Sequence, residues 1–262
     1  MILEDYEYNG RRSADRVNRA LVHLRPTFEG AVLDEITELA RGYVRERRGA
    51  GASLSGIRIE LAALGRDLTL RHRARQIPYR PYLPHIRVEN ARYQFFEDVE
   101  ALTKHLPDVI ADLVRLTAIT GFRMKEATRL RWVEIDDDFG MIRLPGSRTK
   151  NARAKIFPFS SSAQLTAVLC RRRAERCGEY VFHRRGKPIS DFRGVWYRAL
   201  ELSGNEGKDW RDLRRTAARR MLLAGMPIKH IQALMGVRTL KVLLEHYLAF
   251  TEKDLEESVA RL

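Results

Sequence analysis

A chain of 262 residues, of which 44% are hydrophobic, can bury a substantial core in one large or two ordinary domains, which excludes disorder as its main state. It carries 48 lysines and arginines against 34 acidic residues, a net charge of +14, and such an excess is typical of proteins that bind a polyanion. The excess is spread over both halves of the chain, which favours a protein that surrounds its partner over one with a basic tail. A basic surface without a specific ligand is the alternative that charge alone leaves open.

Membrane segments and metal motifs are not apparent in the sequence. No stretch approaches the roughly 18 apolar residues of a membrane-spanning helix, and the first residues lack the apolar run of a secretory signal. The two cysteines, Cys170 and Cys177, do not have the paired spacing of a zinc site and are interpreted as reduced thiols. The sequence therefore predicts a cytoplasmic protein with no metal, cofactor or membrane partner.

The first part of the chain has a helical pattern. Apolar residues recur every three or four positions from Ser13 to Arg48 and again from Ser55 to about Arg75, and the three glycines of RRGAGASLSG break the pattern where the two segments meet. The second segment carries five arginines that can lie along a phosphate backbone, although a solvated face fits equally well. The three prolines of QIPYRPYLPHIRV then predict an extended linker. We place a domain boundary near residue 88, between an N-terminal domain, 1–88, and a second domain, 89–262.

The second domain is predicted to be mainly α-helical with one small antiparallel β-sheet. Helices are expected at Glu97–His105 and at Pro107–Thr120, where Gly121 provides a C-cap. Two short strands, 141–145 and 153–158, are expected on either side of a polar turn. Further helices are expected at 162–176, at 190–203, and as three segments from Trp210 onward that are separated by Gly225 and Gly236.

Two segments of this domain carry residues suited to phosphate chemistry. In TGFRMKEATRLRW, Arg123 and Glu126 are three positions apart on a predicted helix, so the carboxylate can orient the guanidinium. Lys150 lies at the predicted hairpin turn, where an ammonium can reach into a groove or deliver a proton. Each residue also fits an ordinary alternative, a surface ion pair in the first case and a solvated loop lysine in the second.

A third segment, RDLRRTAARRMLLAGMPIKHIQALMGVRTLKVLLEHY, combines two arginines with a tyrosine. Arg211 and Arg214 lie near the start of a predicted helix, where guanidinium groups and free backbone N–H groups can clamp a phosphate. Tyr247 continues an apolar stripe of leucines, and its ordinary role would be a core aromatic with the hydroxyl at the surface.

In this order and separation, the three segments resemble the catalytic domain of the tyrosine recombinases, the phage integrase family. TGFRMKEATRLRWVEID resembles the first arginine box of the family, and RTKNARAKIFPF resembles the hairpin that carries its catalytic lysine. The third segment resembles the second arginine box through to the nucleophilic tyrosine. The helical first part, with GASLSGIRIELAALGRDL, resembles the core-binding domain. The resemblance covers nearly the whole chain.

The resemblance implies catalytic roles for four matching residues: Arg123, Lys150, Arg214 and Tyr247. At two positions the chain departs from the family. Arg211 occupies the position of a histidine or lysine, and Val237 that of a histidine or tryptophan. Arg211 can still donate hydrogen bonds to phosphate but is a poor proton shuttle at neutral pH, and Val237 donates none. Arg211 is therefore counted as a fifth catalytic residue, and reduced activity is expected.

The implied function is that of a site-specific, integrase-type DNA recombinase from a mobile element. Such an enzyme cuts and rejoins double-stranded DNA through a covalent 3′-phosphotyrosyl link, which preserves the phosphodiester energy without metal or cofactor. The implied assembly is a homotetramer on two duplexes, formed from monomers or dimers, with accessory DNA-bending proteins as further partners. The alternative is a weakened, recombinase-like DNA-binding regulator, because MPIKHIQALMG–VRTLKVLLEHY also fits a helix-turn-helix.

Overall fold

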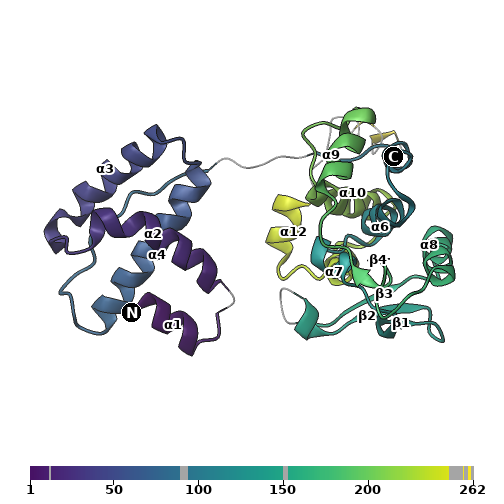
Figure 1. The fold of residues 1–262 in the computed structure, drawn as a ribbon, viewed down its shortest axis with the longest axis horizontal. Coiled ribbons are helices and arrows are strands. Elements are labelled where there is room, and N and C mark those ends of the chain that lie inside the picture. Colours follow the sequence, from purple (N-terminus) through teal and green to yellow (C-terminus); the bar gives the residue numbers. More distant parts are fainter. Residues whose placement is uncertain (12, 89–93, 150–152, 248–255, 257–258, 261–262) are drawn as a thin grey trace. The chain divides into compact units, whose positions relative to one another are not determined.

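The chain forms two compact units, Met1–Asn90 and Ala91–Leu262, which are described separately (Figure 1). The computed structural model describes residues 1–11, 13–88, 94–149, 153–247, 256 and 259–260. Within these ranges no helix is both long and apolar enough to cross a bilayer.

The first unit consists of four α-helices and a short 3₁₀ turn, Leu33–Glu35. The helices are α1 (Ile2–Tyr8), α2 (Ala14–Phe28), α3 (Ile36–Gly49) and α4 (Leu54–Arg73). Their apolar faces enclose one core, to which α2, α3 and α4 contribute the buried Leu24, Ala40 and Ile57. The structure confirms the helices predicted from the apolar repeats. Helix α1 was not predicted, because seven residues are too few to display a helical period.

A buried carboxylate joins α3 to α4. Glu60 accepts hydrogen bonds from the Tyr43 hydroxyl at 2.7 Å and from Nη2 of Arg47 at 2.7 Å. Burial alone would raise the pKa of Glu60, but these two donors outweigh it and hold that pKa below the ordinary value. The charge is thus compensated inside the helical core.

The second unit is built around one buried helix, α6 (Asp108–Thr120). Helices α5 (Val99–Thr103), α8 (Ala163–Ala174) and α10 (Trp210–Leu223) pack against it. Gly121 ends α6 with φ +63°, the left-handed conformation that the predicted C-cap requires. The remaining helices are α7 (Met124–Thr128), α9 (Arg193–Leu202), α11 (Ile228–Met235) and α12 (Leu240–His246).

A three-stranded antiparallel sheet lies beside these helices, in the order β1–β2–β3. Its strands are β1 (Ile135–Asp136), β2 (Met141–Leu144) and β3 (Lys155–Pro158), and Ile142 is paired with Phe157. The predicted hairpin is therefore confirmed, with shorter strands. Strand β1 and a second hairpin, formed by β4 (His183–Arg184) and β5 (Lys187–Pro188), were not predicted, because two-residue strands show no alternation.

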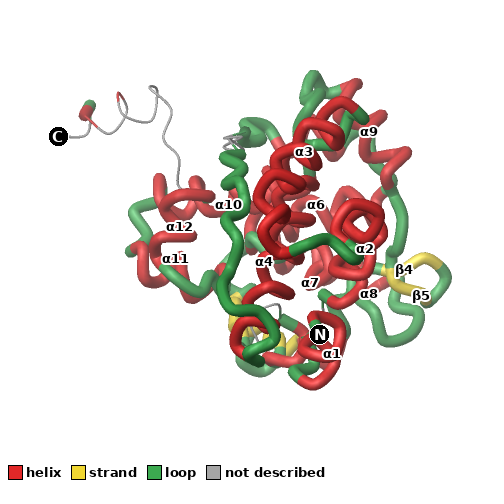
Figure 2. The backbone as a smooth tube through the Cα atoms, turned by 90° about the vertical axis from the view of Figure 1, so that its left-hand side faces the viewer, coloured by secondary structure: helices red, strands yellow, loops and turns green. Residues whose placement is uncertain are grey.

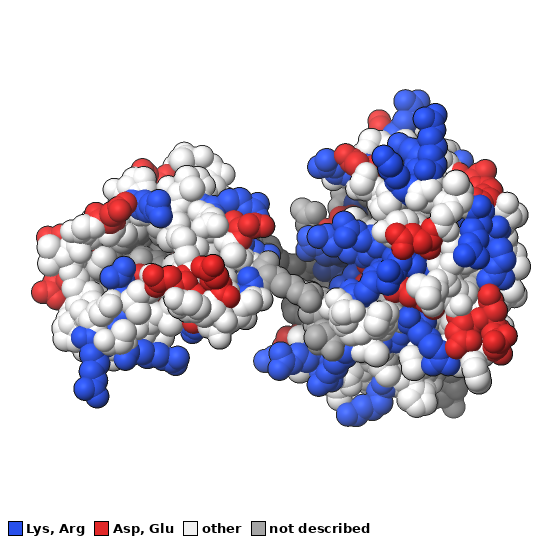
Figure 3. Space-filling view, turned by 60° about the horizontal axis from the view of Figure 1, so that its bottom comes forward, with Lys and Arg blue, Asp and Glu red and all other residues white. Residues whose placement is uncertain are grey.

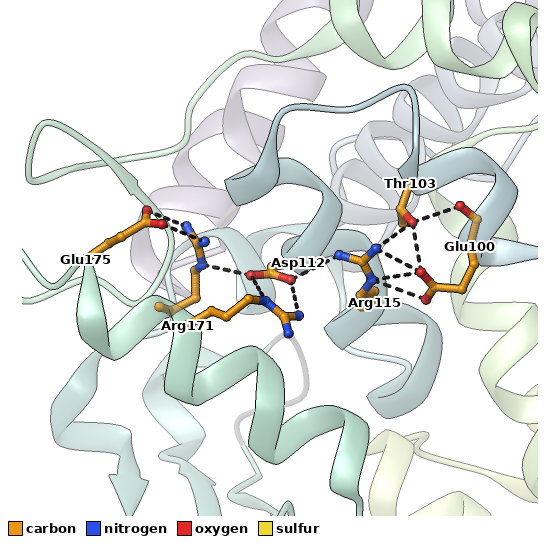
Figure 4. Close-up of polar contacts among 7 residues, drawn as sticks. Glu100, Thr103, Asp112, Arg115, Arg171 and Glu175 are labelled. Carbon is orange, nitrogen blue, oxygen red and sulfur yellow. Dashed lines mark hydrogen bonds and ion pairs between the residues drawn. The ribbon is translucent and has the colours of Figure 1, made fainter.

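A second buried carboxylate ties α6 to α8 (Figure 4). Asp112 of α6 accepts hydrogen bonds from Arg171 at 2.6 Å and Arg172 at 2.9 Å, both on α8. It also pairs with Arg115 on its own helix, and Arg115 in turn binds Glu100 of α5 at 2.8 Å. Since a buried charge is tolerated only when it is paired, this cluster fixes how the three helices pack.

Candidate active site

Arg123 is positioned by one carboxylate. It precedes α7 as the N-cap residue rather than lying within the helix, and Oε2 of Glu126 accepts its backbone N–H at 2.9 Å. Oε1 of the same carboxylate accepts Nη1 of Arg123 at 2.8 Å. The Glu126 side chain is only 3% exposed. The carboxylate of this ion pair is therefore buried, in contrast to the solvated surface pair that was the alternative. It fixes both the backbone and the guanidinium of Arg123.

Arg214 points into the unit from α10. It is 4% exposed, and its two terminal nitrogens donate to the carbonyl of Gly121 and, at 2.8 Å, to the carbonyl of Met235. These carbonyls lie at the C-terminal ends of α6 and α11, where a cation is favoured. Burial, the largest influence, lowers the pKa of Arg214, whereas the nearby Glu126 carboxylate opposes that decrease.

Tyr247 follows α12 directly and contacts Arg214. The Arg214 guanidinium carbon lies 5.0 Å from the centre of the tyrosine ring, a cation–π arrangement. The ring is half-buried and packs against the core of the unit. Tyr247 is thus partly a core aromatic, as spacing alone suggested, while its position beside Arg214 is the one that the family resemblance implies.

The two arginines meet at the C-terminal turn of α11, which lies beside α12 (Figure 2). Arg214 binds the carbonyl of Met235 at 2.8 Å, and Nη2 of Arg123 lies 3.5 Å from the next carbonyl, that of Gly236. Residues from distant parts of the sequence therefore meet at one turn, and Arg214 in turn contacts Tyr247.

Arg211 and Val237 do not join this buried cluster. The side chain of Arg211 is 83% exposed, and its Nε lies 3.8 Å from the Asp209 carboxylate. Val237 is 6% exposed and forms part of the hydrophobic core. The fifth residue singled out from the sequence, Lys150, lies outside the described residues.

The expected phosphate clamp at the start of α10 is wrong in its details. The Asp209 side chain accepts the backbone N–H of Arg211, and Asp212 accepts that of Asp209 at 2.8 Å. These two carboxylates occupy N–H groups that were expected to be free for an anion. Both aspartates are visible in the sequence, but their role as helix caps was not recognised. The Arg214 side chain points into the unit and not toward the start of the helix.

Sequence reasoning missed Lys155, at the start of β3. Its Nζ lies 2.7 Å from Oε2 of Glu126 and 4.5 Å from the centre of the Phe122 ring, and the side chain is 1% exposed. The available signal was strand alternation. In KIFP the lysine shares the inward phase with Phe157, whereas Ile156 faces outward.

Comparisons with known proteins bear on the family and on the fold. Residues 95–253 match the model of the phage integrase family. A search of curated protein sequences finds no match.

Several solved structures share the fold. A λ integrase fragment (75–356), determined as a dimer bound to a COC′ core site, is 15% identical, with a TM-score of 0.75 over 96% of this chain and 98% of that one. The Tn1549 transposon integrase in complex with circular intermediate DNA is also 15% identical, with a TM-score of 0.75 over 98% and 97%. A λ integrase tetramer bound to a Holliday junction matches at 15% identity and a TM-score of 0.70, over 91% and 74%.

At such low identity these likenesses establish the fold alone. The match to the family model is more specific, because it extends over more than half of the chain and includes Arg123, Arg214 and Tyr247. The chain therefore belongs to the phage integrase family.

Proposed function

We propose that the chain is a site-specific DNA recombinase in which Tyr247 is the nucleophile. The phenolic oxygen attacks a DNA phosphate, forms a 3′-phosphotyrosyl link and releases a 5′-hydroxyl, and the reverse reaction on a partner strand rejoins the DNA. The observation that carries this proposal is the contact between Arg214 and Tyr247, with Arg123 on the adjacent carbonyl.

The site has to stabilise charge on the phosphate, deprotonate the phenol and protonate the leaving oxygen. Two arginines serve the first task, because their planar guanidinium groups remain charged at all working pH values. Arg123 is one quarter exposed, so its outer face is open to a phosphate. Lys150 is assigned the last task, because an ammonium can release its proton and a guanidinium cannot.

Arg211 completes the proposed site from its exposed position at the start of α10. Its donors are free to approach a phosphate from solvent, because its only described ion pair, with Asp209, is long at 3.8 Å. It does not supply a proton acceptor for the tyrosine. The predicted result is an enzyme that stabilises the phosphate charge well and activates its nucleophile slowly.

Double-stranded DNA is the proposed partner of both units. Lys and Arg side chains gather over the face of the second unit seen in Figure 3, in keeping with the net charge of +14. The first unit is assigned as the core-binding domain, with the arginines of α4 along the phosphate backbone. Relatives of this fold were solved as a dimer and as a tetramer on DNA, and we assign a homotetramer on two duplexes. Since its substrate is cellular DNA, we place the enzyme in the cytoplasm.

The proposal is tested by trapping the covalent intermediate. Nicked duplexes tiled across the DNA that flanks the gene are incubated with the protein, denatured, and resolved for a protein–DNA adduct. Wild type is expected to form the adduct on one duplex and Tyr247→Phe to form none. The matched control is Tyr197→Phe, since Tyr197 lies on α9 and is 63% exposed, and this variant is expected to behave as wild type. An adduct in Tyr247→Phe would refute the assignment.

A DNA-binding regulator is the second candidate. It is favoured by Val237, which lies in the core and offers no hydrogen bond at a position where the family supplies a polar side chain. Specific binding of one tiled duplex, without an adduct under any condition, would select this candidate over the enzyme.

A further inference from the structure

We propose that Lys155 is a positioning residue of the active site, which fixes the Glu126 carboxylate and balances its charge so that Arg123 remains available to a DNA phosphate. The inference rests on the proposed function of Arg123. It concerns a lysine of β3 that neither the hairpin turn nor the arginine boxes include.

The geometry makes Glu126 a bridge between two cations. One carboxylate oxygen binds Nζ of Lys155 at 2.7 Å, and the other binds Nη1 of Arg123 at 2.8 Å. Lys155 and Glu126 are 1% and 3% exposed, whereas Arg123 is 25% exposed. The buried Lys155 thus neutralises the carboxylate, and the charge of the more exposed Arg123 remains available to a ligand.

Lys155 is enclosed and cannot itself reach a phosphate. Its ammonium lies 4.5 Å from the centre of the Phe122 ring. On another side it packs against Gly236, where an added Cβ would approach Cε of the lysine to 2.8 Å. The same Gly236 offers its carbonyl to Arg123. Lys155 therefore acts through Glu126 and this turn, and not as the acid that protonates the leaving group.

Three charged groups face the lysine: Glu126 of α7, Arg123 at the start of α7, and Arg214 of α10. Burial, which is the largest influence, and the two arginines lower the pKa of Lys155, Glu126 opposes them, and the net result is a pKa of about 8. Above that pH the lysine becomes neutral, and Glu126 then neutralises Arg123 alone. The net charge of Lys155, Glu126 and Arg123 together then falls from +1 to zero.

The first test compares adduct formation between pH 7 and 9.5 for the full-length wild type, Lys155→Arg and Lys155→Met. Wild type is expected to lose about tenfold in rate between pH 8 and 9.5, while Lys155→Arg, whose charge does not titrate, keeps its rate. Lys155→Met should be at least tenfold slower than wild type at pH 7, should lack the decline between pH 8 and 9.5, and should approach the wild-type rate at pH 9.5, with DNA affinity unchanged. Lys187→Met, a change at an exposed lysine of β5, is the matched control and should follow wild type.

Because Lys155→Met removes one of the two cations that hold the buried Glu126, folding is checked by thermal unfolding, and Lys155→Met/Glu126→Gln is prepared as a neutral pair. This double variant restores the net charge of +1 and should be faster than Lys155→Met, but slower than wild type, since Arg123 has lost its ionic partner; a rate no higher than that of Lys155→Met would contradict the charge balance. An alkaline decline in Lys155→Arg equal to that of wild type would overturn the proposal.

A second readout does not depend on catalysis. In protein labelled with ¹³C-lysine, the Lys155 signal, identified by its loss in Lys155→Arg, should titrate near pH 8 in wild type and at lower pH in Glu126→Gln. A Lys155 signal that titrates near the ordinary lysine value of 10.5 would overturn the proposal. Absence of an adduct in wild type, with the NMR titration as expected, would refute the recombinase function and leave the buried pair established.

Discussion

The guanidinium of Arg214 contacts the ring of Tyr247 with one face while its nitrogens bind the terminal carbonyls of α6 and α11. The residue that is expected to stabilise the phosphate thus also joins the two helices that hold the site. The hydrogen bonds that position the guanidinium for this proposed role are therefore the same bonds that join the two helices.

Arg214→Ala should therefore abolish the adduct and also lower the free energy of unfolding by about 2–4 kcal/mol, since two buried carbonyls lose a charged donor. DNA affinity should stay within about tenfold of wild type, because one phosphate contact contributes modestly to binding. The measurements are adduct yield, urea unfolding and a binding titration. Arg211→Ala, at the exposed arginine of the same helix, is the control for stability and should unfold as wild type. Equal stability of wild type and Arg214→Ala would contradict the capping role.

The sequence predicted much of this arrangement. Apolar periodicity located the long helices, and the family motifs singled out Arg214 and Tyr247, which the structure brings into contact. The inward direction of Arg214 was beyond prediction, because it depends on carbonyl groups of two distant helices. Lys155 was missed because a charged residue in a four-residue strand is ordinarily assigned to the solvent face, and only a distant partner, Glu126, makes its burial favourable.

Arg211→His tests whether the departure at this position limits the enzyme. An imidazole can accept the tyrosine proton near neutral pH, whereas arginine cannot, and general base catalysis contributes on the order of 10²–10⁴ in rate. Because Arg211 is exposed, the replacement should fold normally and raise the rate of adduct formation at pH 7 at least tenfold. A rate equal to or below that of the parent would show that hydrogen bonding by Arg211, and not proton transfer, is what the position supplies.

Gly236→Ala should destabilise the protein more than an ordinary left-handed glycine replacement. Gly236 has φ +60°, and an added Cβ would lie 2.8 Å from Cε of Lys155, which is itself held by Glu126. The backbone strain alone costs about 1–2 kcal/mol, and displacing the lysine adds to it. Gly225→Ala is the matched control, with φ +76° and no atom within 4 Å of the added Cβ. If urea unfolding shows the same decrease in the free energy of unfolding for Gly236→Ala and Gly225→Ala, then Lys155 moves aside without an energetic cost.

Acid should weaken the second unit through Glu126. Burial raises the pKa of this carboxyl, but the charge and hydrogen bond of Lys155 and the hydrogen bonds from Arg123 outweigh it, so that the pKa lies below the ordinary 4.5. A lowered pKa contributes stability that is fully present above pH 4.5 and is lost as the pH falls through the folded-state value. One such group changes the free energy of unfolding by at most about 1.4 kcal/mol per pH unit.

Glu126→Gln removes this dependence and leaves Lys155 without its carboxylate. The variant should be less stable than wild type at pH 6 by about 3–5 kcal/mol, the cost of breaking a buried pair, and the difference should shrink as the pH falls below 4.5. Urea unfolding at pH 3 to 7 measures both. Glu206→Gln, at an exposed residue, should parallel wild type throughout. If the difference in the free energy of unfolding between wild type and Glu126→Gln is the same at every pH, then Glu126 stabilises the unit by its shape and hydrogen bonds and its charge contributes nothing.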